Sequence, residues 1–108
     1  MATTLKILGQ ITAAQTASNL YVVPANTQTA VSTINICNLS QSNTFFRIAV
    51  RPAGVALANS MYLAYDTPLG GSDSIAMTMG ITLGNTDIIS VSSISGNVSF
   101  TAFGSELS

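Results

Sequence analysis

Few residues in this chain of 108 could carry out chemistry. The sequence contains no histidine and a single cysteine, Cys37, so the commonest general base and the usual zinc-ligand spacings are both absent. A Ser–His–Asp triad therefore cannot form, and a Ser–Lys dyad would depend on Lys6, which has no nucleophile-elbow motif near it. We expect a protein that is not an enzyme and that binds no metal and no cofactor.

The four carboxylates fall at strand ends or in turns of the expected fold: Asp66, Asp73, Asp87 and Glu106. A glycosidase would need two of them to flank one sugar bond. Their positions instead favour the capping of turns and the protection of sheet edges.

Two arginines and two tyrosines are the candidate partner-contact residues. Arg47 and Arg51 lie on the polar face of the expected strand 44–51. They form either a solvated surface or a contact with an acidic partner, because a guanidinium group suits bidentate pairing with a carboxylate. Tyr62 and Tyr65 are expected on opposite faces of the next strand, one in the core and the other free for an interface.

The elements that position these residues follow from a period of two in the hydrophobic pattern, which is typical of half-buried strands. Turn residues separate the alternating segments. We expect strands at 4–11, 19–23, 28–37, 44–51, 60–66, 73–79, 86–93 and 97–103. Ser95-Gly96-Asn97 favours a tight hairpin between the last two strands.

Eight short strands with regular turns predict an all-β protein, an antiparallel β-sandwich of about eight strands with jelly-roll or immunoglobulin-like topology. Residues 1–108 are expected to form one domain. Residues 1–17 contribute an N-terminal strand or arm and a connector; this strand either pairs within its own domain or docks on a neighbouring subunit. Cys37 is expected to be a small buried hydrophobe.

The composition points to association. Charged residues make up 6% of the chain and the formal net charge is −1, while hydrophobic residues make up 47%. Such a surface has little charge repulsion to keep molecules apart. Three basic residues are too few to neutralise a phosphate backbone, so we expect no nucleic-acid binding. No apolar run approaches the ~20 residues that span a bilayer, and we expect no membrane partner and no export by a signal peptide.

Four segments resemble small virion structural proteins of tailed bacteriophages, including those of cyanobacteria and marine bacteria. They are 20–27 (LYVVPANT), 46–54 (FRIAVRPAG), 62–66 (YLAYD) and 97–106 (NVSFTAFGSE). The resemblance covers most of the chain from residue 18 onward and leaves 1–17 outside. It carries no catalytic motif.

The resemblance implies a β-sandwich on the outside of a phage particle that is assembled in the host cytoplasm. At this size it implies a capsid decoration (cement) protein, a homotrimer over the joints between major capsid proteins. The alternative is a tail, neck or fibre-associated structural or receptor-binding module. A surface that binds sugars usually has exposed aromatic rings on which the sugar stacks. The chain has no tryptophan and only three tyrosines, which weakens this alternative. An unrelated immunoglobulin-like binding module is a third possibility.

Overall fold

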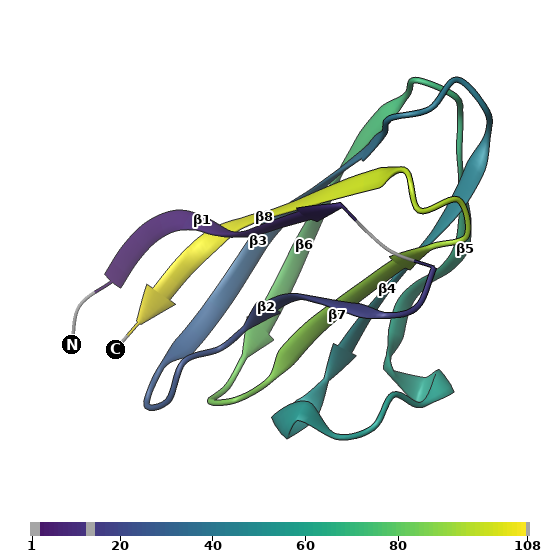
Figure 1. The fold of residues 1–108 in the computed structure, drawn as a ribbon. Helices are drawn as coiled ribbons and strands as arrows, with labels where there is room; N and C mark the ends of the chain where they lie inside the picture. The colour runs from purple at the N-terminus through teal and green to yellow at the C-terminus, as the bar shows by residue number, and fades with distance from the viewer. Residues whose placement is uncertain (1–2, 13–14, 108) are drawn as a thin grey trace.

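The computed structural model describes residues 3–12 and 15–107, which form two packed four-stranded sheets (Figure 1). The strands are β1 (Thr3–Thr12), β2 (Ser18–Val22), β3 (Gln28–Asn38), β4 (Thr44–Arg51), β5 (Tyr62–Leu69), β6 (Ser74–Leu83), β7 (Ile88–Ser93) and β8 (Val98–Leu107). Two single-turn 3₁₀ helices, η1 (Pro52–Gly54) and η2 (Asn59–Met61), lie between β4 and β5. The expected antiparallel β-sandwich is confirmed.

The strand order identifies the topology. Sheet A has the order β1-β8-β3-β6 and sheet B the order β2-β7-β4-β5, with all pairs antiparallel. The first strand thus pairs with the last, the second with the seventh, the third with the sixth and the fourth with the fifth. This nesting is a jelly roll. An immunoglobulin fold would instead place the first two strands side by side in one sheet.

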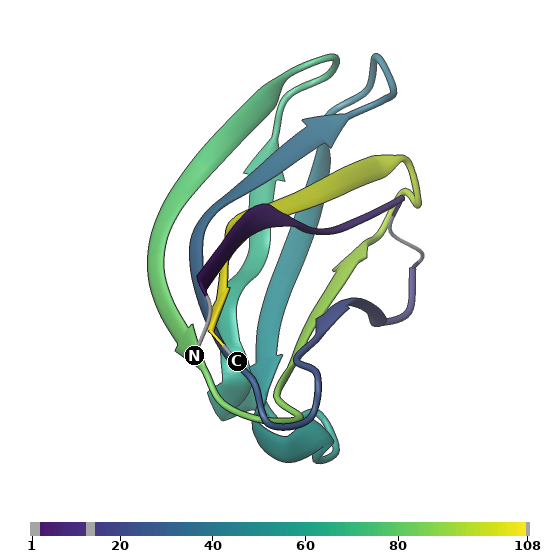
Figure 2. The ribbon, with the colours of Figure 1, turned by 90° about the vertical axis from the view of Figure 1, so that its left-hand side faces the viewer.

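The core lies between the two sheets (Figure 2). The alternation predicted in β4 is confirmed, because Phe46 and Ile48 are fully buried while Arg47 between them is not. Phe46 meets Phe100 of β8 from the opposite sheet, edge to face, with ring centroids 6.2 Å apart. Full burial of such a side chain contributes about 1.5–3 kcal/mol to folding.

Two strands run past their expected ends at residues 79 and 103. β6 continues through Gly80 to Leu83, and β8 continues through Gly104 to Leu107. At Gly104 a Cβ atom would lie 2.1 Å from the carbonyl oxygen of Ala30, so the glycine permits a close backbone approach within the sheet. β5 likewise includes Pro68, which an edge strand accepts because its missing N–H is not needed by a neighbour on both sides.

Two local predictions are wrong. The turn at Ser95-Gly96-Asn97 forms, with Gly96 at φ 71° and its N–H bonded to the oxygen of Ser93, but β7 and β8 belong to different sheets and make no hairpin. Cys37 is half-buried rather than part of the core. Its neighbours in β3 on either side are buried, so the alternation of the strand turns the thiol towards the outer face of sheet A.

Of the two arrangements expected for the N-terminal strand, the structure has the one in which it pairs within its own domain. β1 pairs with β8 of the same chain, from Thr3 opposite Leu107 to Thr12 opposite Ser99. A polar cluster fastens this edge: Lys6 Nζ lies 3.1 Å from Glu106 Oε1, and the other carboxylate oxygen accepts a hydrogen bond from the Tyr21 hydroxyl of β2. The expected connector includes residues 13–14, which lie outside the described residues.

Candidate interaction surfaces

The outer face of sheet B brings together three of the four candidate contact residues. Arg47 of β4 makes a bidentate pair with Asp66 of β5, with Nε–Oδ1 at 2.6 Å and Nη2–Oδ2 at 3.1 Å. The same guanidinium lies over the ring of Tyr65, 4.1 Å from its centroid. Tyr62 packs edge to face against Tyr65, with centroids 4.8 Å apart. We call Arg47, Asp66, Tyr62 and Tyr65 the arginine–tyrosine cluster.

The contact between the two tyrosines contradicts the prediction that they lie on opposite faces of their strand. The ladder between β4 and β5 shifts register twice, between Phe46 and Ile48 and between Ile48 and Ala49. Each shift inserts an extra β5 residue, and Asp66 takes a positive φ of 48°. A bulge resets the alternation of side chains. Tyr62 and Tyr65 therefore reach the same side.

Within this cluster, Arg47 and Asp66 stabilise each other's charged form. Hydrogen bonding to Asp66 raises the pKa of the Arg47 guanidinium. The hydrogen bond from Arg47 in turn holds the pKa of the Asp66 carboxyl below its usual value. Both groups stay charged and neutralise each other, so the surface presents a rigid, locally neutral feature rather than a free positive charge.

Arg51, the fourth candidate, organises the loop that follows β4. Its Nε donates to the oxygen of Val55 at 2.7 Å and its Nη2 donates to the oxygen of Gly54 at 2.9 Å. Its Nη1 reaches the side chains of Asn19 and Ser90 at 3.4 and 3.5 Å. The guanidinium thus holds η1 against the sheet, and most of its donors are used within the chain.

Sequence reasoning missed a small cleft of mixed polar and apolar lining beside the arginine–tyrosine cluster. It has a volume of about 180 Å³ and is lined by Arg47 and Asp66 together with Phe45, Ile94, Gln15 and two serines of β7. Phe45 and Ile94 are 47% and 69% exposed. The signal available in the sequence was the pair Phe45-Phe46, since a strand that buries one of two adjacent phenylalanines must expose the other.

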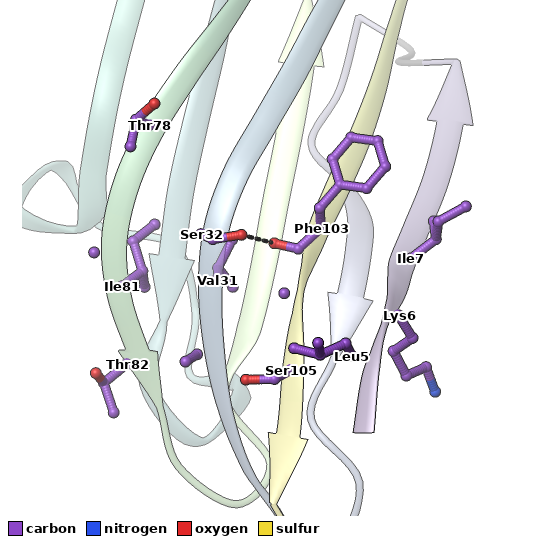
Figure 3. A pocket seen from close by; sticks show the side chains of 13 residues that line it. Leu5, Lys6, Ile7, Val31, Ser32, Thr78, Ile81, Thr82, Phe103 and Ser105 are labelled. Atoms are coloured by element: carbon purple, nitrogen blue, oxygen red, sulfur yellow. Dashed lines mark hydrogen bonds between the residues drawn. The ribbon is translucent and has the colours of Figure 1, made fainter. Parts of the chain in front are cut away.

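A larger hollow lies on the outer face of sheet A (Figure 3). It is open, has a volume of about 800 Å³, and receives side chains from β1, β3, β6 and β8; they include Leu5, Ile7, Ser32, Thr78, Ile81, Thr82, Phe103 and Ser105. Ser32 donates a hydrogen bond to the oxygen of Phe103 across its floor. Lys6, paired with Glu106, is its one charged lining residue.

The hollow exists because sheet A bends along one line. The β1–β8 ladder shifts register between Ile7 and Gly9, and both ladders of β3 shift between Val31 and Thr33. These irregularities sit at neighbouring positions, since Phe103 is the partner of both Ile7 and Thr33. Bulges bend the strands that carry them. Figure 2 shows the resulting curvature, most clearly in the green strand β6.

All seven charged side chains are engaged within the chain. Two ion pairs account for four of them, Lys6–Glu106 and Arg47–Asp66. Arg51 binds backbone oxygens, Asp73 accepts the N–H of Ser74, and Asp87 accepts the N–H groups of Ala53 and Gly84. The expected turn-capping role is confirmed for the last two. The outer faces are consequently almost free of unbalanced charge.

The part of the chain that the structure describes was also compared with the requirements of a metal site and of a membrane-spanning helix. Across residues 3–12 and 15–107, no three His, Cys, Asp or Glu side chains gather closely enough to hold a metal ion. Every buried polar side-chain atom in that part of the chain has a hydrogen-bond partner. No helix of the described residues is long and apolar enough to cross a membrane.

Comparison with known proteins adds little. No family model matches the sequence, and no curated protein matches it. Among solved structures, the chain is similar to one in the structure of infectious bursal disease virus, Gx strain, at 15% identity and a TM-score of 0.48. The match covers 97% of this chain and 30% of that one, so this chain spans less than a third of the matched chain. A likeness this weak supports no conclusion, and the resemblance to tailed-phage proteins stays a prediction.

Proposed function

We propose that the chain is a non-enzymatic structural subunit of a virus particle, most specifically a capsid decoration protein that sits over the joints between major capsid proteins. The observation that carries the proposal is the neutral, partly apolar character of both outer faces. Leu5 on sheet A is 83% exposed and Phe45 on sheet B is 47% exposed. Neighbouring side chains of both faces carry no free charge.

The charge arrangement supports function by association. A monomer in solution usually keeps a surplus of charge that repels its copies. Here the few charged side chains form ion pairs or cap turns within the chain. The outer faces can therefore be buried against a neighbour without leaving a charged group unpaired. Such faces suit a permanent neighbour better than a transient, charge-steered partner.

The jelly roll is compatible with this role, although a fold by itself does not determine function. Jelly rolls occur in viral capsid domains and in lectin domains. The lectin reading, which belongs to the receptor-binding alternative, is the weaker one here. The guanidinium of Arg47 covers one face of the Tyr65 ring, and Tyr62 abuts the same ring, so that face is not open for stacking on a sugar.

The proposal includes two partners: the major capsid protein and further copies of the chain, with three copies around each joint as the phage resemblance implies. Exposed sheet edges would then be covered by neighbours, which removes the hazard of uncontrolled strand pairing. Nucleic acid and membrane are not among the proposed partners.

Counting copies per particle tests the location. Quantitative mass spectrometry of purified particles that carry this chain should give a copy number comparable with that of the shell protein. A copy number of only a few per particle would contradict a decoration role and favour the tail, neck or fibre alternative.

Substitution of the exposed apolar residues tests which face is used. Leu5→Lys places a charge on the outer face of sheet A, and Phe45→Lys does so on sheet B. Leu39→Lys is the matched control, because Leu39 is 60% exposed in a loop after β3. One face variant should lose occupancy on the shell while the control binds as the wild type does. Equal binding by all three variants would contradict the proposal.

A further inference from the structure

We propose that β6 is a pairing edge: it forms an antiparallel ladder with β6 of a second copy about a two-fold axis, which joins two copies of sheet A into one eight-stranded sheet. The inference concerns a surface that the proposed function does not specify, and it does not depend on a virion location. A two-fold contact leaves any three-fold assembly to a different surface.

The other three sheet edges carry devices that discourage strand pairing. β1 has the charged Lys6 and a register shift after Ile7. β2 is only five residues long and is irregular between Asn19 and Tyr21. β5 contains Pro68 and two register shifts. Short length, charge, proline and bulges are the means by which proteins protect an exposed edge.

β6 lacks most of these devices. It is ten residues long, Ser74–Leu83, and contains no charged residue and no proline. At ~3.3 Å per residue it spans about 33 Å, which is a long edge for a small sandwich. Its one irregularity is the shift against β3 between Thr78 and Ile81. A strand of this kind, left open, is a template for pairing with another chain.

The core is also incompletely covered along β6. Ile75, Met77 and Ile81 pack against the core but remain only partly buried. The neighbouring β3 buries Ile34 and Ile36 completely. A strand added beyond β6 would shield these three side chains from water while it satisfies the backbone groups of the free edge.

The chemistry of β6 favours a second copy as the occupant. In an antiparallel pair of identical strands, like charges would face each other and repel, but β6 has none. Its exposed outer residues are small or hydroxylated, with Ala76, Thr78 and Thr82 on that face. Threonines that face each other across a ladder are mutually favourable. Isologous two-fold contacts are the commonest way in which soluble chains associate.

The first test measures mass by light scattering after size exclusion. The wild-type chain should form a particle with an even number of copies. Thr78→Lys/Thr82→Lys should halve that mass, because two added charges on each β6 would face their copies. Thr4→Lys/Thr12→Lys is the matched control on β1, the other edge strand of sheet A. Both double variants replace two exposed threonines of an edge strand. It should keep the wild-type mass.

Circular dichroism and thermal melting establish that both variants are folded. A wild-type mass of one chain at all concentrations would overturn the proposal. Equal masses for the β6 variant and the wild type would also overturn it. Association only with a different protein through β6 would replace the second copy by that protein and would likewise overturn it.

Cross-linking gives a second test that adds no charge. In a Cys37→Ser background, single cysteines at positions 74, 76, 78 and 82 are oxidised alone and in mixed pairs, so that several pairs share a sum. An antiparallel two-fold ladder requires the two residue numbers of every efficient cross-link to add up to one constant value. Cross-links with a constant difference instead, or none above the level of a cysteine replacing Thr4, would refute the pairing.

Discussion

Gly104 offers a direct perturbation of the bend that shapes the outer face of sheet A. A Cβ atom at this position would lie 2.1 Å from the carbonyl oxygen of Ala30, whereas real Cβ contacts essentially never fall below 3.0 Å. The Gly104→Ala substitution must therefore push β8 and β3 apart by about 0.9 Å. Backbone hydrogen bonds near 2.9 Å would then exceed 3.5 Å and be lost locally.

The expected cost follows from that separation. Two flanking backbone hydrogen bonds contribute about 1 kcal/mol each. Crowding in a packed region adds about 1 kcal/mol. We therefore expect Gly104→Ala to lower the free energy of unfolding by about 3 kcal/mol, which at this chain length corresponds to a fall in Tm of about 12 °C.

Gly80→Ala is the matched control on the same bent sheet. A Cβ atom at Gly80 would have no heavy atom within 4 Å. The change should be neutral or stabilise by up to about 1 kcal/mol, because alanine loses less backbone entropy than glycine. Urea denaturation of both variants measures the difference. Equal stabilities, within about 0.5 kcal/mol, would refute the reasoning about close backbone approach at Gly104.

Four further predictions concern the stability of the fold. The hydrogen bond from Tyr21 holds the pKa of the Glu106 carboxyl below its usual value. The stability that the Glu106 carboxylate contributes should therefore be complete above the unfolded pKa of about 4.3 and be lost as pH falls through the folded pKa. In a plot of Tm against pH, Glu106→Gln should flatten this loss on the acid side. Burial raises the pKa of Tyr21 to about 12, so stability should also fall as pH rises from about 10 towards 12, and Tyr21→Phe should remove one late-titrating phenol from the ultraviolet titration. A double-mutant cycle of Phe46→Leu and Phe100→Leu should give a coupling of about 0.5–1.5 kcal/mol, and no coupling would contradict the edge-to-face contact. Asn38→Ala should cost about 1–3 kcal/mol in urea denaturation, because the buried amide donates to the oxygens of Ser42 and Gly70; a loss below 0.5 kcal/mol would mean that these loops do not rely on it.

The strands were predictable because a strand that is buried on one face alternates apolar and polar residues along the sequence. Phe46 and Ile48 show this pattern, and the observed β4 has the expected bounds. Strand ends were harder to predict at Gly80, Gly104 and Pro68. Each of these residue types weakens a strand in isolation, but its effect depends on which backbone lies beside it.

The topology was not predictable to the same degree, since the choice between jelly roll and immunoglobulin fold depends on contacts between distant segments. The turn at Ser95-Gly96-Asn97 shows why. Its residues specify a sharp reversal with positive φ at Gly96, and such a reversal serves a crossing between two sheets as well as a hairpin within one.

For the candidate contact residues, the sequence predicted the exposed face of Arg47 correctly but not the side chains that surround it. Arg47 does lie on the outer face of β4, but its carboxylate partner is Asp66 of its own chain rather than a carboxylate of another subunit. The two bulges of β5 bring Tyr62 and Tyr65 together, and nothing in the alternation of that segment marks a bulge. Whether this cluster meets a partner stays a prediction.

The central claim is that this chain functions through its outer surfaces, as a subunit of an assembly. Light scattering of the purified 11.1 kDa chain over a wide concentration range, alone and mixed with purified shells of the particle that carries it, tests this most directly. The account predicts self-association and binding to the shells. A stable single chain at high concentration that also leaves the shells unbound would contradict it.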